Sequence, residues 1–197
     1  MSDPTLSPAA TVPWPIERTA RRIGHYRWWE MRLFELVGAW ARSVPEPQVA
    51  ARLGDHSHRH GWHAELWGDL IPELDHLSAD RVVAAPDGLD GLVEVLEGGS
   101  DADTCDRLVG VYRVVVPRLV AAYGHHLDHT LAATDGPTIR VLRLALSDLA
   151  EDLQHAERLV QGLISTPDDV ERVASRAREI ETIIVSAGGI CGSDTLG

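Results

Sequence analysis

The sequence predicts an all-α fold, in which four long helices form a single bundle and a further helix follows at the C-terminus. Three observations predict it. Apolar residues recur at spacings of three and four over long stretches, which is the period of an amphipathic helix. Prolines and glycines gather between these stretches, where helices end. The sequence shows no run of alternating apolar and polar residues, the pattern that marks a half-buried β-strand.

The first two helices are predicted over residues 16–41 and 46–70. The segment SVPEP at 43–47 separates them, because proline ends one helix and is well placed in the first turn of the next. The apolar stripe of the first helix consists of Ile23, Tyr26, Leu33, Val37 and Trp40. Residues 1–15 contain four prolines, which interrupt regular structure, so we expect a flexible N-terminal arm.

A connection over residues 72–103 follows, and it is longer than the usual turn between bundle helices. A short helix is predicted inside it, around 89–96. The third long helix is predicted over 103–132. Pro117 lies within it and is expected to bend it, because the proline ring clashes with the preceding turn.

The fourth helix is predicted to begin after Gly136 and to run to residue 163. The segment STPDD at 165–169 combines a hydroxyl cap, a proline and two acids, which is typical of a helix start. The fifth helix then extends to residue 186, and the glycine-rich segment 187–197 is expected to be a flexible tail. The predicted bundle domain therefore covers residues 16–186.

The formal net charge of −12 disfavours nucleic acid and anionic membranes as partners. The densest basic cluster, at Arg18, Arg21 and Arg22, is outweighed by acidic residues elsewhere. No apolar stretch approaches the length of a membrane span. The two cysteines form no disulfide framework, and the N-terminus lacks the pattern of a signal peptide. We therefore expect a cytoplasmic protein.

Polar side chains on the inward faces of these helices carry the functional information, because burying a charge or an imidazole is costly unless it is paired or bound. Glu30 falls on the apolar stripe of the first helix. In the second helix, His56, His60 and His63 are spaced by four and three residues, which places three imidazoles on one face.

The fourth and third helices add further groups of the same kind. Asp148, Asp152 and His155 repeat that spacing on the fourth helix, with Glu151 beside them. Tyr123 and His126 lie on the inward side of the third helix. Imidazole and carboxylate together suit iron, manganese, zinc or copper, so four helices direct potential ligands toward one centre.

Two segments, HSHRHGWHAELWGDLIPEL and DGPTIRVLRLALSDLAEDLQHAERL, resemble the second and fourth helices of ferritin-like bacterial proteins of the diiron-carboxylate type. Such bundles use one Glu from each of two helices and Glu-x-x-His from the other two. The resemblance covers about residues 20–163, and Glu30, His63 and His155 match its motif positions. His60 and Asp152 stand where the family has Glu, and the third helix offers only Tyr123 or His126.

The first functional hypothesis is a metalloenzyme. Its candidate metal ligands are Glu30, His60, His63, His126, Asp152 and His155. His56, Tyr123, Asp148 and Glu151 are the candidate catalytic residues, as proton-transfer groups or supports of the ligands. The resemblance implies iron and dioxygen, and hence oxidation, hydroxylation or desaturation of a small, largely apolar organic molecule. The four tryptophans expected to wall its pocket are Trp28, Trp29, Trp62 and Trp67.

Alternatives remain open at this point. The metal is manganese, zinc or copper, or no metal binds and histidines and carboxylates perform acid–base chemistry, as in an isomerase, cyclase or lyase. A non-catalytic bundle that binds a ligand or a partner subunit is a third hypothesis. Glu30 is then a core carboxylate paired with Arg27, and Asp148, Glu151 and Asp152 line a solvated face. The apolar side of the fifth helix packs either on the bundle or on a second copy in a homodimer.

Overall fold

A computed structural model describes residues 12–98 and 103–193, and over these residues the chain is helical, without a β-strand. The long elements are α1 (Ile16–Ala41), α2 (Pro47–Gly68), the run of α5 (Thr104–Leu108), η1 (Val109–Val115) and α6 (Val116–Leu127), then α7 (Gly136–Leu163) and α8 (Pro167–Ser186). Two short helices, α3 (Ala79–Val82) and α4 (Leu92–Glu97), lie in the long connection. The predicted all-α class is thus confirmed for the described residues.

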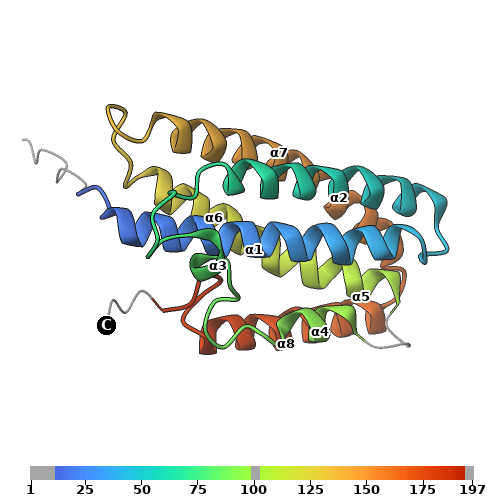
Figure 1. Cartoon of the computed structure of the whole chain (residues 1–197). Helices are drawn as coiled ribbons and strands as arrows, with labels where there is room; N and C mark the ends of the chain where they lie inside the picture. Colours follow the sequence, from blue (N-terminus) through green and yellow to red (C-terminus); the bar gives the residue numbers. More distant parts are fainter. Residues whose placement is uncertain (1–11, 99–102, 194–197) are drawn as a thin grey trace, which may run out of the picture.

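The long elements lie side by side (Figure 1). α1 and α2 pack against each other along their lengths, and α7 contacts both α2 and the run of η1 and α6. The apolar stripe predicted for α1 forms part of the core: Ile23, Tyr26, Leu33, Val37 and Trp40 are all buried. None of the helices described is long and apolar enough to cross a bilayer.

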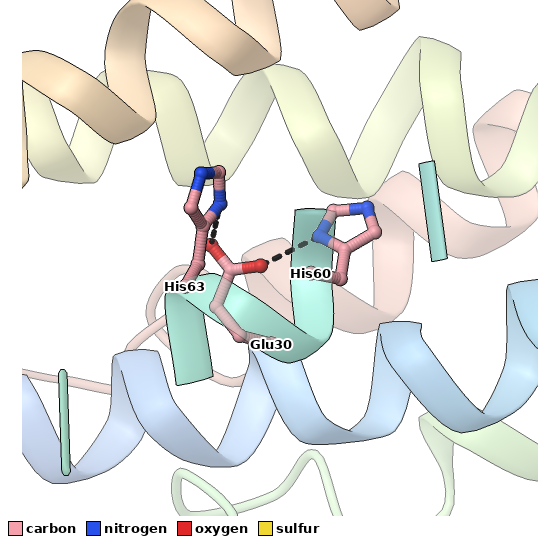
Figure 2. Close-up of side chains that lie close together, drawn as sticks. All are labelled: Glu30, His60 and His63. Atoms are coloured by element: carbon pink, nitrogen blue, oxygen red, sulfur yellow. Dashed lines mark hydrogen bonds and ion pairs between the residues drawn. The ribbon is translucent and has the colours of Figure 1, made fainter. Parts of the chain in front are cut away.

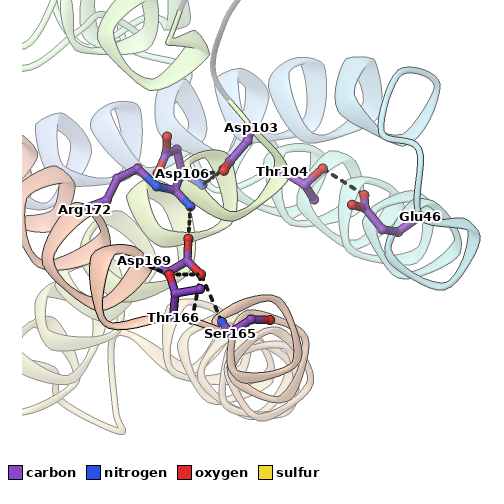
Figure 3. Close-up of polar contacts among 8 residues, drawn as sticks. All are labelled: Glu46, Asp103, Thr104, Asp106, Ser165, Thr166, Asp169 and Arg172. Atoms are coloured by element: carbon purple, nitrogen blue, oxygen red, sulfur yellow. Dashed lines mark hydrogen bonds and ion pairs between the residues drawn. The ribbon is translucent and has the colours of Figure 1, made fainter.

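α8 closes the other side of the molecule, against η1 and α4. Its start is the one that the sequence predicts, because the Thr166 hydroxyl accepts from the Asp169 backbone and the Asp169 carboxylate accepts from that of Thr166. Figure 3 shows Arg172 held between Asp169 and two aspartates at the start of α5, Asp106 within the helix and Asp103 at its N-cap, 2.6 Å away. Val173, Ile180 and Ile184 are buried within the chain itself, so the apolar side of α8 packs on the bundle.

The connection between α2 and α5 crosses α1 (Figure 1). The predicted short helix is present as α4, whereas α3 has no counterpart among the predicted helices. α3 approaches α1 closely, since a Cβ on Gly24 would lie 2.0 Å from the carbonyl oxygen of Val82. Any side chain at position 24 would force the backbone apart, so glycine allows α3 to cross α1 at this short distance.

The third long helix differs from its prediction. It ends at Leu127 rather than 132, and a π-helical segment occupies residues 109–115, directly before the turn that contains Pro117. In an α-helix the ring of Pro117 would clash with the carbonyl of Arg113. The wider turn of the π-helix accommodates that carbonyl and changes the register of the residues inside it, Tyr112 among them.

Both predicted flexible ends pack against the bundle over their described residues. Ile190 and Cys191 are buried, and the Trp29 indole donates to the Ile190 carbonyl at 2.7 Å, so this part of the predicted tail packs on the bundle. The Trp14 ring stacks on His126 with 4.6 Å between centroids. The rest of the arm, 1–11, and of the tail, 194–197, lies outside the described residues.

Candidate metal centre

α2 presents three buried imidazoles, as its spacing predicts. His56, His60 and His63 are each at most 2% exposed. The one-turn steps of four and three residues place them on the side of α2 that faces the core. Because a buried imidazole nitrogen requires a partner, the surroundings of each ring decide what it can do.

The first group, which we call the Glu30 cluster, consists of Glu30, His60 and His63 (Figure 2). His60 Nδ1 lies 2.6 Å from Glu30 Oε2, and the Tyr123 hydroxyl donates to Glu30 Oε1 at 2.6 Å. His63 Nδ1 lies 3.5 Å from the same Oε1, at ion-pair distance. Both carboxylate oxygens of Glu30 therefore accept short hydrogen bonds, neither of which comes from Arg27, the partner considered from the sequence.

The Glu30 cluster reaches the surface through one residue. His63 Nε2 lies 3.1 Å from Asp148 Oδ2. The Asp148 side chain is 21% exposed, whereas Glu30, His60 and His63 are wholly buried. His63 thus bridges a buried carboxylate on α1 and a solvated carboxylate on α7.

Charges within the Glu30 cluster compensate one another. Burial alone would raise the pKa of Glu30, but the charges of His60 and His63 and the hydrogen bonds from them lower it to about 2. Burial would lower the pKa of His63, but Glu30 and Asp148 raise it to about 8. At neutral pH, Glu30 is a carboxylate facing a protonated His63, so its charge is neutralised without a metal ion.

The second group, the Asp152 cluster, consists of His56, Asp152 and His155, whose ligand atoms all lie within 4.8 Å of one another. It joins α2 to α7. His56 Nε2 lies 3.3 Å from Asp152 Oδ1, and the rings of His56 and His155 stack with 6.2 Å between centroids. The other nitrogen of His56, Nδ1, lies 2.8 Å from the hydroxyl of Tyr112 on η1.

The Asp152 cluster contains polar atoms without hydrogen-bond partners. Two of them, His56 Nε2 and Asp152 Oδ2, are buried and make no hydrogen bond. Arg59 donates only to the other oxygen, Asp152 Oδ1, at 2.6 Å. Burial and the nearby His60 and Arg59 lower the pKa of His56 to about 3, and burial raises that of Asp152 to about 6. His56 is therefore a neutral imidazole with a lone pair.

Two residues predicted for the same site lie elsewhere. His126 is buried against Trp14 and Tyr26, where burial lowers its pKa to about 4, and it belongs to neither cluster. Its position near the end of α6, beyond Tyr123, takes it past the Glu30 cluster. Glu151 is 52% exposed and pairs with Arg59 at 3.1 Å, so it lies on the solvated face.

The four tryptophans do not surround one pocket. Trp67 packs against Tyr123, and Trp62 lies beside His63 with 6.2 Å between ring centroids, so two of them adjoin the Glu30 cluster. Trp29, with Trp28 against it, is directed toward the C-terminal segment instead. The four rings diverge because their positions on α1 and α2 point in different directions.

Two functional residues escaped the sequence analysis. Tyr112 belongs to the apolar stripe of its helix, and its hydroxyl reaches His56 only in the register of η1. Nothing in the sequence singles out Arg59. It lies one turn after Asp55 and between two inward histidines, at the edge of the inward face of α2. A search for partners of each buried imidazole would have found the tyrosine.

Comparison with known proteins identifies no relative. No family model matches the chain, and neither a curated protein nor a solved structure matches it. The identification of buried His, Glu and Asp groups that could hold a metal ion therefore rests on the geometry of this chain alone.

Proposed function

We propose that this protein is a ferritin-like four-helix-bundle metalloenzyme that oxidises a small, largely apolar organic molecule, with iron as its metal. The observation that carries the proposal is the Asp152 cluster, where His56 Nε2 and Asp152 Oδ2 are buried, close together and without hydrogen-bond partners. A buried imidazole lone pair beside a buried carboxylate oxygen costs free energy unless each atom has a partner. A divalent cation would be a partner for both atoms.

The donor chemistry supports iron. Two imidazoles and one carboxylate are the donors of mononuclear non-haem iron(II) sites, and zinc accepts the same set. The described residues offer no cysteine near either cluster, so a site for soft thiolate-bound metals is disfavoured. Bound iron would supply the oxidising chemistry, with dioxygen as the co-reactant.

The arrangement of the helices supports the ferritin-like part of the proposal. α1, α2, the run α5–η1–α6, and α7 are the four long segments, and the long connection falls between the second and the third. A long crossover at this point is the connection pattern of ferritin-like bundles. Both clusters lie among these four segments, where such bundles place their metals.

A groove at the junction of α2 and α7 has the size of a small-molecule site. Its volume is about 540 Å³, within the range of small-molecule sites. Leu66, Leu70 and Val141 give it an apolar lining, with Arg140 and Asp69 at its polar part. Leu66 is one turn beyond His63 and about three turns of α2 beyond His56, so the groove adjoins the Glu30 cluster and not the Asp152 cluster. The chain of Glu30, His63 and Asp148 connects the interior with solvent and would carry protons between them.

Elemental analysis of protein purified without added metal or chelator tests the proposal. We expect iron in near-stoichiometric amount, or its recovery when the metal-free protein is reconstituted with Fe(II) without oxygen. A folded protein that retains no iron, manganese, zinc or copper after reconstitution would overturn it.

A second candidate function follows from His63. This imidazole, with its pKa raised to about 8, lies between a buried and a solvated carboxylate, an arrangement suited to general acid–base catalysis without a metal. It predicts a folded, metal-free protein in which a small-molecule ligand shifts the titration of His63, followed by NMR of the imidazole signals. A His63 titration that no active ligand changes would argue against this candidate.

A further inference from the structure

We infer that the metal site is mononuclear and consists of His56, Asp152 and His155, whereas Glu30 is a positioning residue and not a ligand. The inference rests on the proposed function and deepens it by choosing between two groups with the same composition. Each cluster has two histidines and one carboxylate. The two clusters differ in which of their carboxylate oxygens accept hydrogen bonds.

In the Asp152 cluster, lone pairs on the potential ligand atoms are not taken up by hydrogen bonds and are available to a metal ion. His56 Nε2 and Asp152 Oδ2 are buried and make no hydrogen bond, and a nitrogen of His155 lies within 4.8 Å of both residues' ligand atoms. Three donors leave further positions on the metal open for a substrate or dioxygen, as catalytic sites require.

Tyr112 supplies the support that a ligating histidine needs. A metal-bound imidazole usually donates its other N–H to a fixed oxygen, which sets the tautomer and the ring orientation. The Tyr112 hydroxyl lies 2.8 Å from His56 Nδ1, and the tyrosine is buried. When His56 Nδ1–H donates to this oxygen, the lone pair remains on Nε2, next to Asp152. Tyr112 occupies the π-helical segment, a feature that often accompanies functional sites.

Both oxygens of Glu30, in contrast, already accept hydrogen bonds. Oε1 accepts from Tyr123 and Oε2 from His60, both at 2.6 Å. A metal ion on Glu30 would compete with these short bonds and would lie beside His63, whose Nδ1 is 3.5 Å from Oε1. The cost of that rearrangement favours the other cluster.

His60 joins the two groups. Its Nδ1 is held by Glu30, while Figure 2 shows its Nε2 turned away from Glu30 and His63. That Nε2 is buried and has no hydrogen-bond partner. His60 also lies one turn from His56 on the inward face of α2. Glu30 therefore fixes an imidazole that faces the interior beside the proposed site.

On the outer side of α2 and α7, Arg59 separates the buried Asp152 from solvent. Arg59, which is 28% exposed, covers Asp152, and the exposed Glu151 holds Arg59 in place. The arginine adds one positive charge close to the site, and Asp148 and Glu151 offset it. Rotation of the Arg59 side chain into solvent would uncover Asp152 without disturbing the core.

The test compares one chemical change in both clusters. Asp152→Asn and Glu30→Gln each turn a carboxylate into an amide of the same shape, and His58→Ala removes an exposed histidine of α2 as the control. Co(II) is titrated without oxygen into metal-free protein, and the d–d absorption bands report the affinity and coordination. Zn(II) competition repeats the measurement, and far-UV circular dichroism verifies that each variant is folded.

We expect the wild type and His58→Ala to bind one Co(II) per chain, and Asp152→Asn to bind it at least 100-fold more weakly. Glu30→Gln should retain one Co(II) with at most a 10-fold loss. Should Asp152→Asn prove unfolded, Tyr112→Phe replaces it, with an expected 10- to 100-fold loss, on the order seen when an outer partner of a ligand is removed.

The remaining outcomes distinguish a wrong ligand assignment from a wrong proposed function. Loss of Co(II) in Glu30→Gln with retention in Asp152→Asn, or equal loss in both, would overturn the assignment while the proposed metalloenzyme stands. Two Co(II) per wild-type chain would overturn the mononuclear site. Binding of neither Co(II) nor Zn(II) by the folded wild type would overturn the proposed function itself.

Discussion

The Glu30 cluster and the Asp152 cluster contain the same types of residue, two histidines and one carboxylate, yet their surroundings differ. In the Glu30 cluster both carboxylate oxygens accept short hydrogen bonds, from Tyr123 and His60. Both clusters contain imidazole nitrogens without a hydrogen-bond partner, but only the Asp152 cluster also has a buried carboxylate oxygen without one. Ligand types alone therefore do not identify a metal site. A carboxylate whose two oxygens both accept hydrogen bonds stabilises the fold, whereas one with an oxygen that accepts none is available for binding.

The largest effect on stability is expected for Glu30→Ala. The substitution leaves three buried groups, on His60, His63 and Tyr123, without their common partner, and loss of one member of a buried ionic network costs about 3–5 kcal/mol. Chemical denaturation measures it. Glu35→Ala, on the exposed face of α1, is the control and should change the unfolding free energy by less than about 0.5 kcal/mol. A Glu30→Ala protein as stable as the control would show that the cluster does not hold the fold together.

Two buried tyrosines of one continuous helical run provide a matched pair. Tyr123→Phe removes a hydrogen bond to a charged carboxylate and should cost about 1.5–3 kcal/mol of unfolding free energy. Tyr112→Phe removes a hydrogen bond to a neutral imidazole, at about 1 kcal/mol, and should instead weaken metal binding. Denaturation and Co(II) titration of both variants measure the two effects, and the reverse pattern would exchange the roles of the clusters.

The stability of the metal-free protein should be highest near pH 6.5. Burial, followed by nearby arginines, lowers the pKa of His25 and His126 to about 4, so the unfolded state binds more protons as the pH falls below 6.5. The pKa of His63 is raised to about 8, so its contribution is full below 6.5 and is lost as the pH rises through 8. Each proton of difference changes stability by about 1.4 kcal/mol per pH unit.

Urea denaturation between pH 4.5 and 9 in the presence of a chelator measures this profile. His126→Gln should flatten only the acid side, since His63 controls the alkaline side. An alkaline side that remains flat in the wild type would contradict the protonated His63 described for the Glu30 cluster.

The smallest effect is expected for Arg59→Gln. Removal of the guanidinium frees Asp152 Oδ1 and takes a positive charge from the site, so metal affinity should rise. A partly exposed ion pair contributes about 0.2–1 kcal/mol, which corresponds to an increase of up to about fivefold. Competition with a chelator of known affinity measures it. An unchanged or weaker affinity would place the metal away from Asp152.

The helices were predictable because they depend on local patterns. Apolar spacing and proline placement predicted α1, α2, α7 and α8 to within about three residues at each end. The interruption in the third long helix was predictable only as a bend at Pro117. A proline does not by itself show whether the helix bends or widens into a π-helix, and η1 also packs against α7 and α8, which no local pattern encodes.

The candidate site was predictable in its residues but not in its grouping. The inward spacing identified Glu30, His56, His60, His63, Asp152 and His155, and the structure buries all of these or half-buries them. Spacing along one helix does not determine which residue of another helix lies opposite. The division into two clusters, the separation of His126 and the contact of Tyr112 with His56 arise from packing between helices.

Anomalous X-ray scattering from crystals grown with Fe(II) or Co(II) is the most direct test of the central claim. The metal is expected as a single peak within bonding distance of His56 Nε2, Asp152 and His155, with Glu30 still bonded to Tyr123 and His60. A peak on Glu30 and His63, or a crystal of folded protein without any metal peak, would contradict it.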